Sequence, residues 1–132
     1  MAEMSNYLEN ALINATLRNT SYTSPTTVYV SLHTADPTDS GSTAAEVSTS
    51  STGYARKSVT FGAPSDGVSS NSADVTFDAA TASWGTVTHI GIWDSSSGST
   101  NMLYYTALDS SKTIDTGDIF KITSGNLTVT LA

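Results

Sequence analysis

The 132-residue sequence contains no cysteine, which excludes disulfides, thiolate catalysis and cysteine-ligated zinc or iron–sulfur sites. Charge is also scarce: only 13% of the residues are charged, and five basic residues stand against twelve acidic ones. A sequence-independent nucleic-acid binder needs clustered Lys and Arg, so this balance excludes that class. We therefore expect no nucleic-acid partner.

Long apolar runs are absent too, since none approaches the ~20 residues of a membrane span. The first five residues lack the basic-then-apolar layout of a signal peptide, so we expect no membrane partner. The length fits one domain. What the sequence has in excess is hydroxyl groups, because 22 Ser and 22 Thr make up a third of it. Such a neutral, weakly repulsive surface suits a protein that sits among other proteins.

Residues 5–18 have the only credible helical pattern. Asn6, with Glu9 three positions later, has the layout of a capping box and predicts the helix start. Pro25 prevents the helix from continuing. An apolar stripe recurs at three- and four-residue spacing and comprises Met4, Leu8, Ala11, Leu12 and Ala15.

After Pro25 the apolar period changes to two, which predicts strands. Seven segments carry this signal: 28–33, 54–61, 73–77, 86–94, 102–108, 119–123 and 127–131. Segment 102–108 is apolar on both faces, so we interpret it as a central strand covered on both sides. No helical crossover separates the segments, so their pairing is expected to be antiparallel. We predict an all-β fold, an antiparallel, jelly-roll-like β-sandwich at 23–132 preceded by an N-terminal α-helix or arm at 1–22.

The two histidines, His33 and His89, are the natural candidates for catalysis. His33 is expected on the outward face of the first strand, and no Gly-x-Ser-x-Gly nucleophile motif accompanies either residue. Their spacing matches no metal motif. Residues 36–41 superficially resemble a calcium loop, but position 12 of that loop is Val47 instead of Glu. We predict no catalytic, cofactor-binding or metal-ligating residues, and therefore a protein that is not an enzyme and needs no cofactor.

A sugar-binding module is an alternative that needs exposed aromatic side chains. Trp84, Trp93, Tyr104 and Tyr105 lie within or beside apolar strands, so core packing is the preferred interpretation. If Trp93 and Tyr105 lay coplanar and exposed at the rim of one sheet, a glycan-binding role would gain support.

Several blocks of the sequence, in collinear order, resemble a family of short bacteriophage virion proteins. They include Gly53-Tyr-Ala-Arg-Lys57 and Trp84-Gly-Thr-Val-Thr-His-Ile-Gly-Ile-Trp-Asp94. The remaining blocks are 5–12, 22–34, 37–39, 70–77, 117–118 and 125–131. Members are commonly labelled tail-fibre proteins, and similar small β-rich domains serve as capsid decoration (cement) proteins. The resemblance implies a structural protein of the virion and no catalytic residues.

From the resemblance and the composition together we expect a non-enzymatic virion component, assembled in the cytoplasm of the bacterial host. The first expectation is a cement protein that binds the outer shell as a homo-oligomer, for example a trimer. The alternative is a tail-fibre or baseplate component, or a receptor (glycan)-binding module. The expected partners are further copies of the chain and the major capsid protein or tail proteins.

The N-terminal helix is the predicted docking element. Ile13 and Leu17 lie on a face that adjoins the main apolar stripe, and Tyr7 extends it. A sandwich supplies its own two inner faces, so it does not need this second face. We therefore predict Tyr7, Ile13 and Leu17 as interface residues that pack against a sister subunit or the shell. The alternative is that the helix only plugs one open end of the sandwich.

Overall fold

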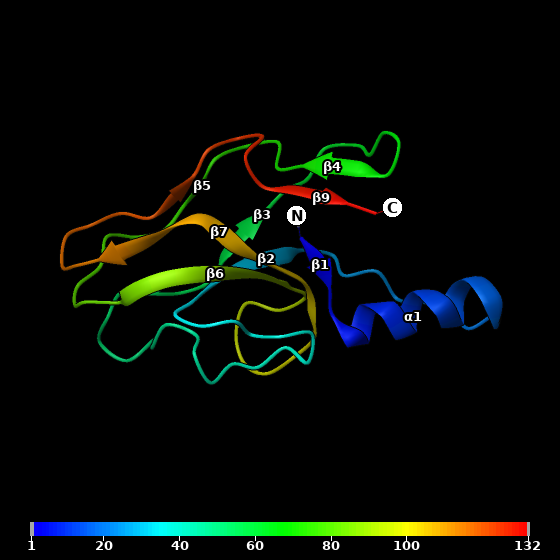
Figure 1. The fold of residues 1–132 in the computed structure, drawn as a ribbon, viewed down its shortest axis with the longest axis horizontal. Coiled ribbons are helices and arrows are strands. Elements are labelled where there is room, and N and C mark those ends of the chain that lie inside the picture. The colour runs from blue at the N-terminus through cyan, green and yellow to red at the C-terminus, as the bar shows by residue number, and fades with distance from the viewer. Residues whose placement is uncertain (1, 132) are drawn as a thin grey trace.

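The computed structural model describes residues 2–131 and consists mainly of antiparallel strands with one helix near the N-terminus (Figure 1). The predicted fold class, all-β with one N-terminal α-helix, is thereby confirmed. The elements in chain order are β1 (Glu3–Met4), α1 (Asn6–Leu17), β2 (Val28–His33), β3 (Lys57–Val59), β4 (Val68–Ser70), β5 (Val75–Thr76), β6 (Gly85–Trp93), β7 (Met102–Ile114), β8 (Lys121–Ile122) and β9 (Thr128–Thr130).

The strands form one large sheet and two small ribbons. The large sheet has the order β1-β7-β6-β2-β3, and the ribbons pair β4 with β9 and β5 with β8. Both ribbons lie on the same side of the large sheet in Figure 1, with β3 in contact with β5. This arrangement gives the two layers of a sandwich, in which the second layer is short and divided.

The apolar core lies between the large sheet and the ribbons. Alternation places Val30 and Leu32 of β2 on this face, where both are fully buried. Four aromatic rings pack against one another across the layers, with ring centroids 5.5–6.4 Å apart: Tyr54, Phe77, Trp84 and Phe120. Such edge-to-face and offset contacts add to the area that the rings bury.

The opposite face of β2 and β6 is covered as well, by loops. His33 forms an isolated bridge with Glu46, and Val47 donates its N–H to Leu32 O at 3.0 Å. The prediction that His33 points outward to solvent is therefore wrong, because this side chain is 0% exposed. Alternation places it correctly on the face opposite the core, but the loop between β2 and β3 then closes over that face.

The helix starts one residue earlier than the capping-box pattern predicts. Ser5, not Asn6, is the N-cap: its Oγ accepts the Leu8 N–H at 3.2 Å. The Ser5 hydroxyl also donates to the carbonyl of Met102, and its N–H donates to Leu103 O at 2.9 Å. The start of α1 is thus tied to the beginning of β7.

Strand β7 differs from its prediction as well. It is nearly twice as long as predicted, running to Ile114, and it lies between β6 and the two-residue strand β1. Consecutive burial is limited to Met102 and Leu103, so the double covering predicted for 102–108 holds only at the start. Its register with β6 shifts beyond Val87, so that residues 108–111 lie opposite the single residue Thr88 in a β-bulge.

Candidate functional site

A buried polar cluster lies beneath the large sheet, on the face that the loops cover. Ser31 Oγ accepts the indole N–H of Trp93 at 2.7 Å and lies 2.7 Å from His33 Nε2. Burial lowers the pKa of His33 to about 4; the Glu46 carboxylate opposes this shift and the Arg56 guanidinium reinforces it. The imidazole is therefore neutral at physiological pH.

An ion pair closes the cluster on its outer side. The Arg56 guanidinium donates to both carboxylate oxygens of Glu46 at 2.8 Å, and it stacks 4.0 Å from the centroid of the Trp93 ring. Tyr54 donates its hydroxyl to the same carboxylate at 2.6 Å. Burial by itself raises the pKa of Glu46, but the hydrogen bonds from Arg56 and Tyr54 outweigh it and hold that pKa below its ordinary value.

Arg56 also fastens two covering segments together. Its guanidinium donates to the carbonyls of Ser95 and Gly98 at 3.1 and 2.8 Å, in the segment between β6 and β7. Since Glu46 lies in the other covering segment, this single side chain joins the two loops over the Trp93 ring. The cluster therefore has a structural role: it holds the two covering loops together.

The contact between Ser31 and His33 resembles a nucleophile and its base, but no substrate can reach it. Both side chains are fully buried, beneath the Glu46–Arg56 pair. A nucleophile must touch the reacting atom, so this geometry supports a structural role for the pair.

The acidic side chains at the strand ends satisfy backbone groups. Asp74 accepts the Ser124 N–H at 2.8 Å, and Asp94 accepts the Asn101 N–H at 3.2 Å. In the turn at 36–41, Asp36 accepts the Thr38 N–H at 2.8 Å, as an ordinary Asx turn does. Within residues 2–131 there is no group of three or more His, Asp and Glu side chains that could hold a metal ion.

Trp93 and Tyr105 do not form an exposed platform for a sugar. The Trp93 ring is 0% exposed and lies under Arg56, and Tyr105 is only partly exposed. Trp84 lies in the apolar core and Tyr104 packs against it, as core packing predicts. Trp93 is buried on the opposite, loop-covered face, and Tyr105 is not part of the core.

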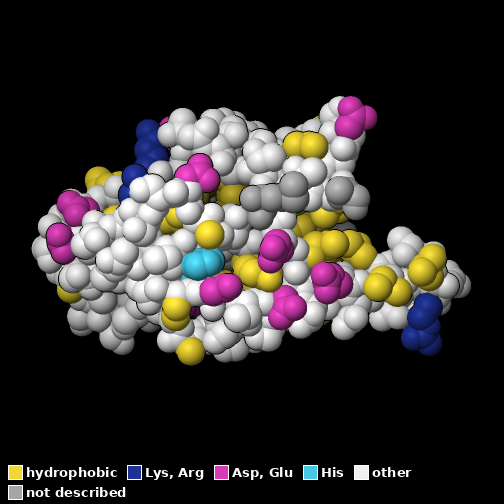
Figure 2. Space-filling model, viewed as in Figure 1, with side chains coloured by type: hydrophobic (Ala, Val, Ile, Leu, Met, Phe, Trp, Pro, Cys, Tyr) yellow, Lys and Arg dark blue, Asp and Glu magenta, His cyan; other side chains and the backbone are white. Residues whose placement is uncertain are grey.

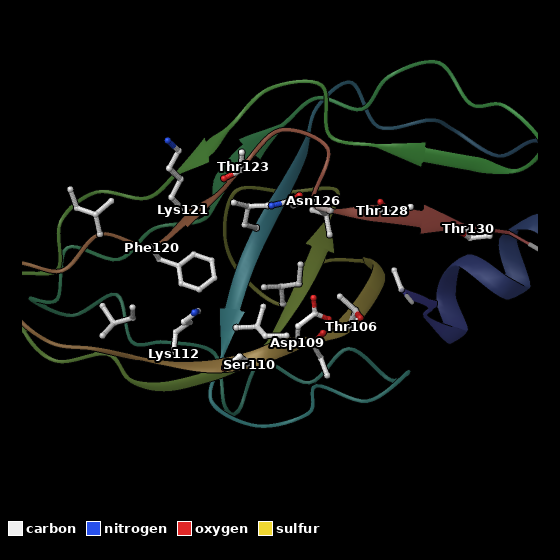
Figure 3. Close-up of a pocket in the computed structure, with 18 residues that line it drawn as sticks. Thr106, Asp109, Ser110, Lys112, Phe120, Lys121, Thr123, Asn126, Thr128 and Thr130 are labelled. Carbon is white, nitrogen blue, oxygen red and sulfur yellow. Dashed lines mark hydrogen bonds between the residues drawn. The ribbon is translucent and has the colours of Figure 1, made fainter.

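An open groove of about 800 Å³ lies between the later part of β7 and the segment that carries β8 and β9 (Figure 3). Its apolar lining includes Leu108, Ile119 and Ile122, and Ile119 is 58% exposed. Lys112 and Lys121 lie toward the end of the groove that is distant from α1, whereas Thr130 lies beside α1. Its lining mixes these apolar side chains with Lys, Asp, Ser, Thr and Asn side chains.

The helix extends away from the body, as Figure 1 shows. It packs against β1 and β7, and the Asn6 N–H at its start donates to Asp39 O at 2.9 Å. Within it only Leu8 is fully buried. The predicted interface residues Tyr7, Ile13 and Leu17 are 40%, 53% and 79% exposed. The structure thus places all three at the surface, and Figure 2 shows apolar side chains along the helix out to its far end.

Two features of the site were not anticipated from the sequence. Glu46 and Arg56 lie ten residues apart, Glu46 in a stretch without periodicity and Arg56 in a predicted strand, so no local pattern marks them as a pair. The groove depends on how β7 and the final strands face each other. The signals that could have pointed to it are Ile119, an apolar residue directly after a turn, and two of the chain's three lysines nearby.

Comparison with known families identifies the chain. The family described as "Podophage GP4 fiber I protein gp80" matches residues 3–130, which is nearly the whole length. The chain belongs to this family. It is therefore a structural protein of the bacteriophage virion, as the resemblance seen in the sequence implies. No curated protein matches the chain.

Among residues 2–131, α1 is the only helix, and it is too short to cross a bilayer. The surface of this fibre-family protein carries its charges unevenly (Figure 2). Acidic side chains gather near the base of α1, whereas the basic ones on this face lie at the far end of α1 and at the opposite end of the body.

Proposed function

We propose that the protein is a non-enzymatic module of the phage tail fibre that assembles with further copies of itself through α1. The observation that carries this proposal is the exposed apolar face of α1, on a chain that belongs to a phage fibre family. Burying one such side chain contributes roughly 1.5–3 kcal/mol, and repetition around an oligomer multiplies the effect. Self-assembly in the host cytoplasm would precede attachment to the tail.

The body of the protein supports a role as a compact module instead of a fibre shaft. Its strands are short, apart from β2, β6 and β7, and they form layers around one core. The hydroxyl-rich surface carries few charges that would repel a neighbour, which suits close packing among other virion proteins. Absence of catalysis is supported by the burial of Ser31 and His33, whose contact resembles a nucleophile and its base.

Capsid decoration is the competing function, and the position of the protein on the particle separates the two. The test is antibody labelling of the purified phage in the electron microscope, combined with the copy number per virion by quantitative mass spectrometry. A tail-fibre module gives label at the tail and at most a few dozen copies. Label spread over the head with hundreds of copies would refute the fibre role and establish decoration.

The role of α1 in assembly has a separate test. Because residues 3–5 are hydrogen-bonded to β7, deleting the N-terminal segment would also remove part of the sheet. Point substitutions avoid this problem, since Ile13 and Leu17 are exposed. The double variant I13S/L17S should keep its melting temperature and lose incorporation into particles. Normal incorporation of this folded variant would show that α1 is not the docking element.

A further inference from the structure

We propose that His33 and the Glu46–Arg56 pair form an acid-sensitive latch. Proton uptake by His33 releases residues 45–47 from the end of β2, so that the two covering loops part while the core stays folded. The covering loops are residues 34–56 and 94–101, which meet at the Glu46–Arg56 pair. This inference concerns the conformation of one chain, so it does not depend on the role of α1 or on the position of the protein on the particle.

The imidazole of His33 cannot satisfy a second proton while the loops are closed. Its Nε2 lies 2.7 Å from Ser31 Oγ, which also accepts the Trp93 indole N–H. Its Nδ1 is buried and, within residues 2–131, has no hydrogen-bond partner. An imidazolium ion carries an N–H group on both nitrogens, so its Nδ1–H is then a buried charged donor without an acceptor. Because such a group is costly to bury, the closed form binds a proton poorly.

The ionisable side chains that act on His33 come from three elements: Glu46 of the loop after β2, Arg56 just before β3, and His89 opposite it on β6. Burial opposes the charged imidazole most; Arg56 and His89 oppose it too, whereas Glu46 favours it. Tyr54 completes the cluster, and its hydroxyl stays neutral because burial raises its pKa. Since the pKa of Glu46 is held below its ordinary value, the ion pair itself stays charged between pH 8 and pH 5.

The part of the cover that opens is residues 45–47, which lie along the end of β2. Glu46 forms an isolated bridge with His33, and Val47 donates its N–H to Leu32 O at 3.0 Å. A short segment held by few hydrogen bonds opens at a smaller free-energy cost than the core strands. When the segment leaves, the Glu46 carboxylate goes with it and water reaches the imidazole.

Arg56 couples this opening to the second covering loop. Its guanidinium binds both carboxylate oxygens of Glu46 and also the carbonyls of Ser95 and Gly98. Departure of Glu46 leaves the guanidinium buried without its carboxylate, which is unfavourable. The second loop therefore separates from Arg56 in the same step, and water reaches both the guanidinium and the Trp93 ring beneath it.

The size of the acid response follows from the pKa of His33 in the two forms. In the closed form this pKa is about 4, and in the open form, where water solvates the ring, it has the ordinary value of 6.5. Opening therefore takes up a proton at pH 5 but not at pH 8. The ratio of open to closed molecules should rise about 30-fold between pH 8 and pH 5.

Amide hydrogen exchange of the wild-type protein measures the opening, when it is followed by NMR at both pH values and corrected for intrinsic exchange rates. The Val47 N–H reports on the latch. The Phe77 N–H, which donates to Phe120 O at 2.9 Å in the core, reports on global unfolding. We expect the protection of Val47 to fall about 30-fold on acidification and to lie at least tenfold below that of Phe77 at pH 5. Equal protection of the two amides at pH 5 would overturn the proposal, and so would protection of Val47 that does not change with pH.

Two histidine variants assign the response to its group. H33Q removes the titrating imidazole and should abolish the acid response of Val47. H89Q is the matched control, because His89 lies directly opposite on β6, and it should keep the response. An unchanged response in H33Q, or its loss in H89Q, would assign the effect to another group and refute the latch.

A reversible crosslink tests whether the covering loops must part. Thr43 and Ser99 lie in different loops with their hydroxyl oxygens 3.3 Å apart, so their side chains are within reach of a disulfide. The natural chain has no cysteine, so the variant T43C/S99C can form only this intramolecular bond, and its reduced form is the control. The reduced form should keep the acid response, whereas oxidation should raise the protection of Val47 at pH 5 at least tenfold. Equal protection of Val47 in the two forms would overturn the proposal.

Discussion

Mild acid should destabilise the protein through a single buried imidazole. His33 is fully buried, bonded to Ser31 on one side, and burial lowers its pKa from about 6.5 to about 4. Between these two values the unfolded chain binds a proton and the folded protein does not. The contribution of the neutral His33 to the free energy of unfolding is therefore fully present above pH 7 and is lost as the pH falls from 7 toward 4.

The magnitude follows from the two pKa values. Integrating the proton uptake of a group with pKa 6.5 unfolded and about 4 folded gives a loss of about 2 kcal/mol between pH 8 and pH 5. For a chain of this size the urea slope is about 2 kcal/mol per molar, so the unfolding midpoint should fall by about 1 M urea. The carboxylates whose pKa is lowered, such as Glu46, titrate below this window and do not contribute.

The assay is urea unfolding followed by tryptophan fluorescence at pH 8 and pH 5. In H33Q the amide is neutral throughout, so its midpoint should change little between the two pH values, whatever its stability at pH 8. H89Q is the matched control because it removes the other imidazole, which is only half-buried and contacts Thr88 at 2.8 Å. It should retain most of the wild-type loss. A full 1 M shift in H33Q would refute the assignment to His33.

Three further substitutions test the packing by urea unfolding at pH 8. S5A removes the N-cap and its bond to the sheet, and it should cost about 1–2 kcal/mol. R56M leaves the Glu46 carboxylate buried without its partner and should cost about 3–5 kcal/mol, part of which E46Q in the same chain should restore. G91A places a Cβ 2.8 Å from two buried polar atoms and should cost about 1–3 kcal/mol. Its control G62A, with its nearest contact at 3.8 Å, should stay within about 0.5 kcal/mol, and equal losses in the two variants would contradict the close approach.

The long strands could be predicted from the sequence because their alternation reflects the core directly. In β2 and β6 the apolar residues of one face meet the two ribbons, so a period of two marks both strands along most of their length. Strands β1 and β4 have two and three residues and carry no pattern of their own. They form because partner strands offer backbone groups there, which only the three-dimensional arrangement shows.

The candidate site was less predictable, for a related reason. Periodicity assigns His33 to the face opposite the core, but it cannot show that a loop without periodicity covers that face. The choice between Ser5 and Asn6 as N-cap is settled by a contact between distant parts of the chain, since the Ser5 hydroxyl also reaches the Met102 carbonyl. The exposed residues of α1 were predictable because a helix has a regular surface, whereas the groove joins segments that are not neighbours in the sequence.

The bulge at residues 108–111 limits nonspecific strand pairing along the edge of β7. Beyond Tyr105, and within residues 2–131, strand β1 no longer pairs with β7, so a flat strand there would offer backbone groups to any passing β-strand. The bulge interrupts that row of groups and bends the strand. Because this edge is a poor template, any partner that binds here must be recognised by side chains instead of by continued strand pairing, and side chains can discriminate one partner from another.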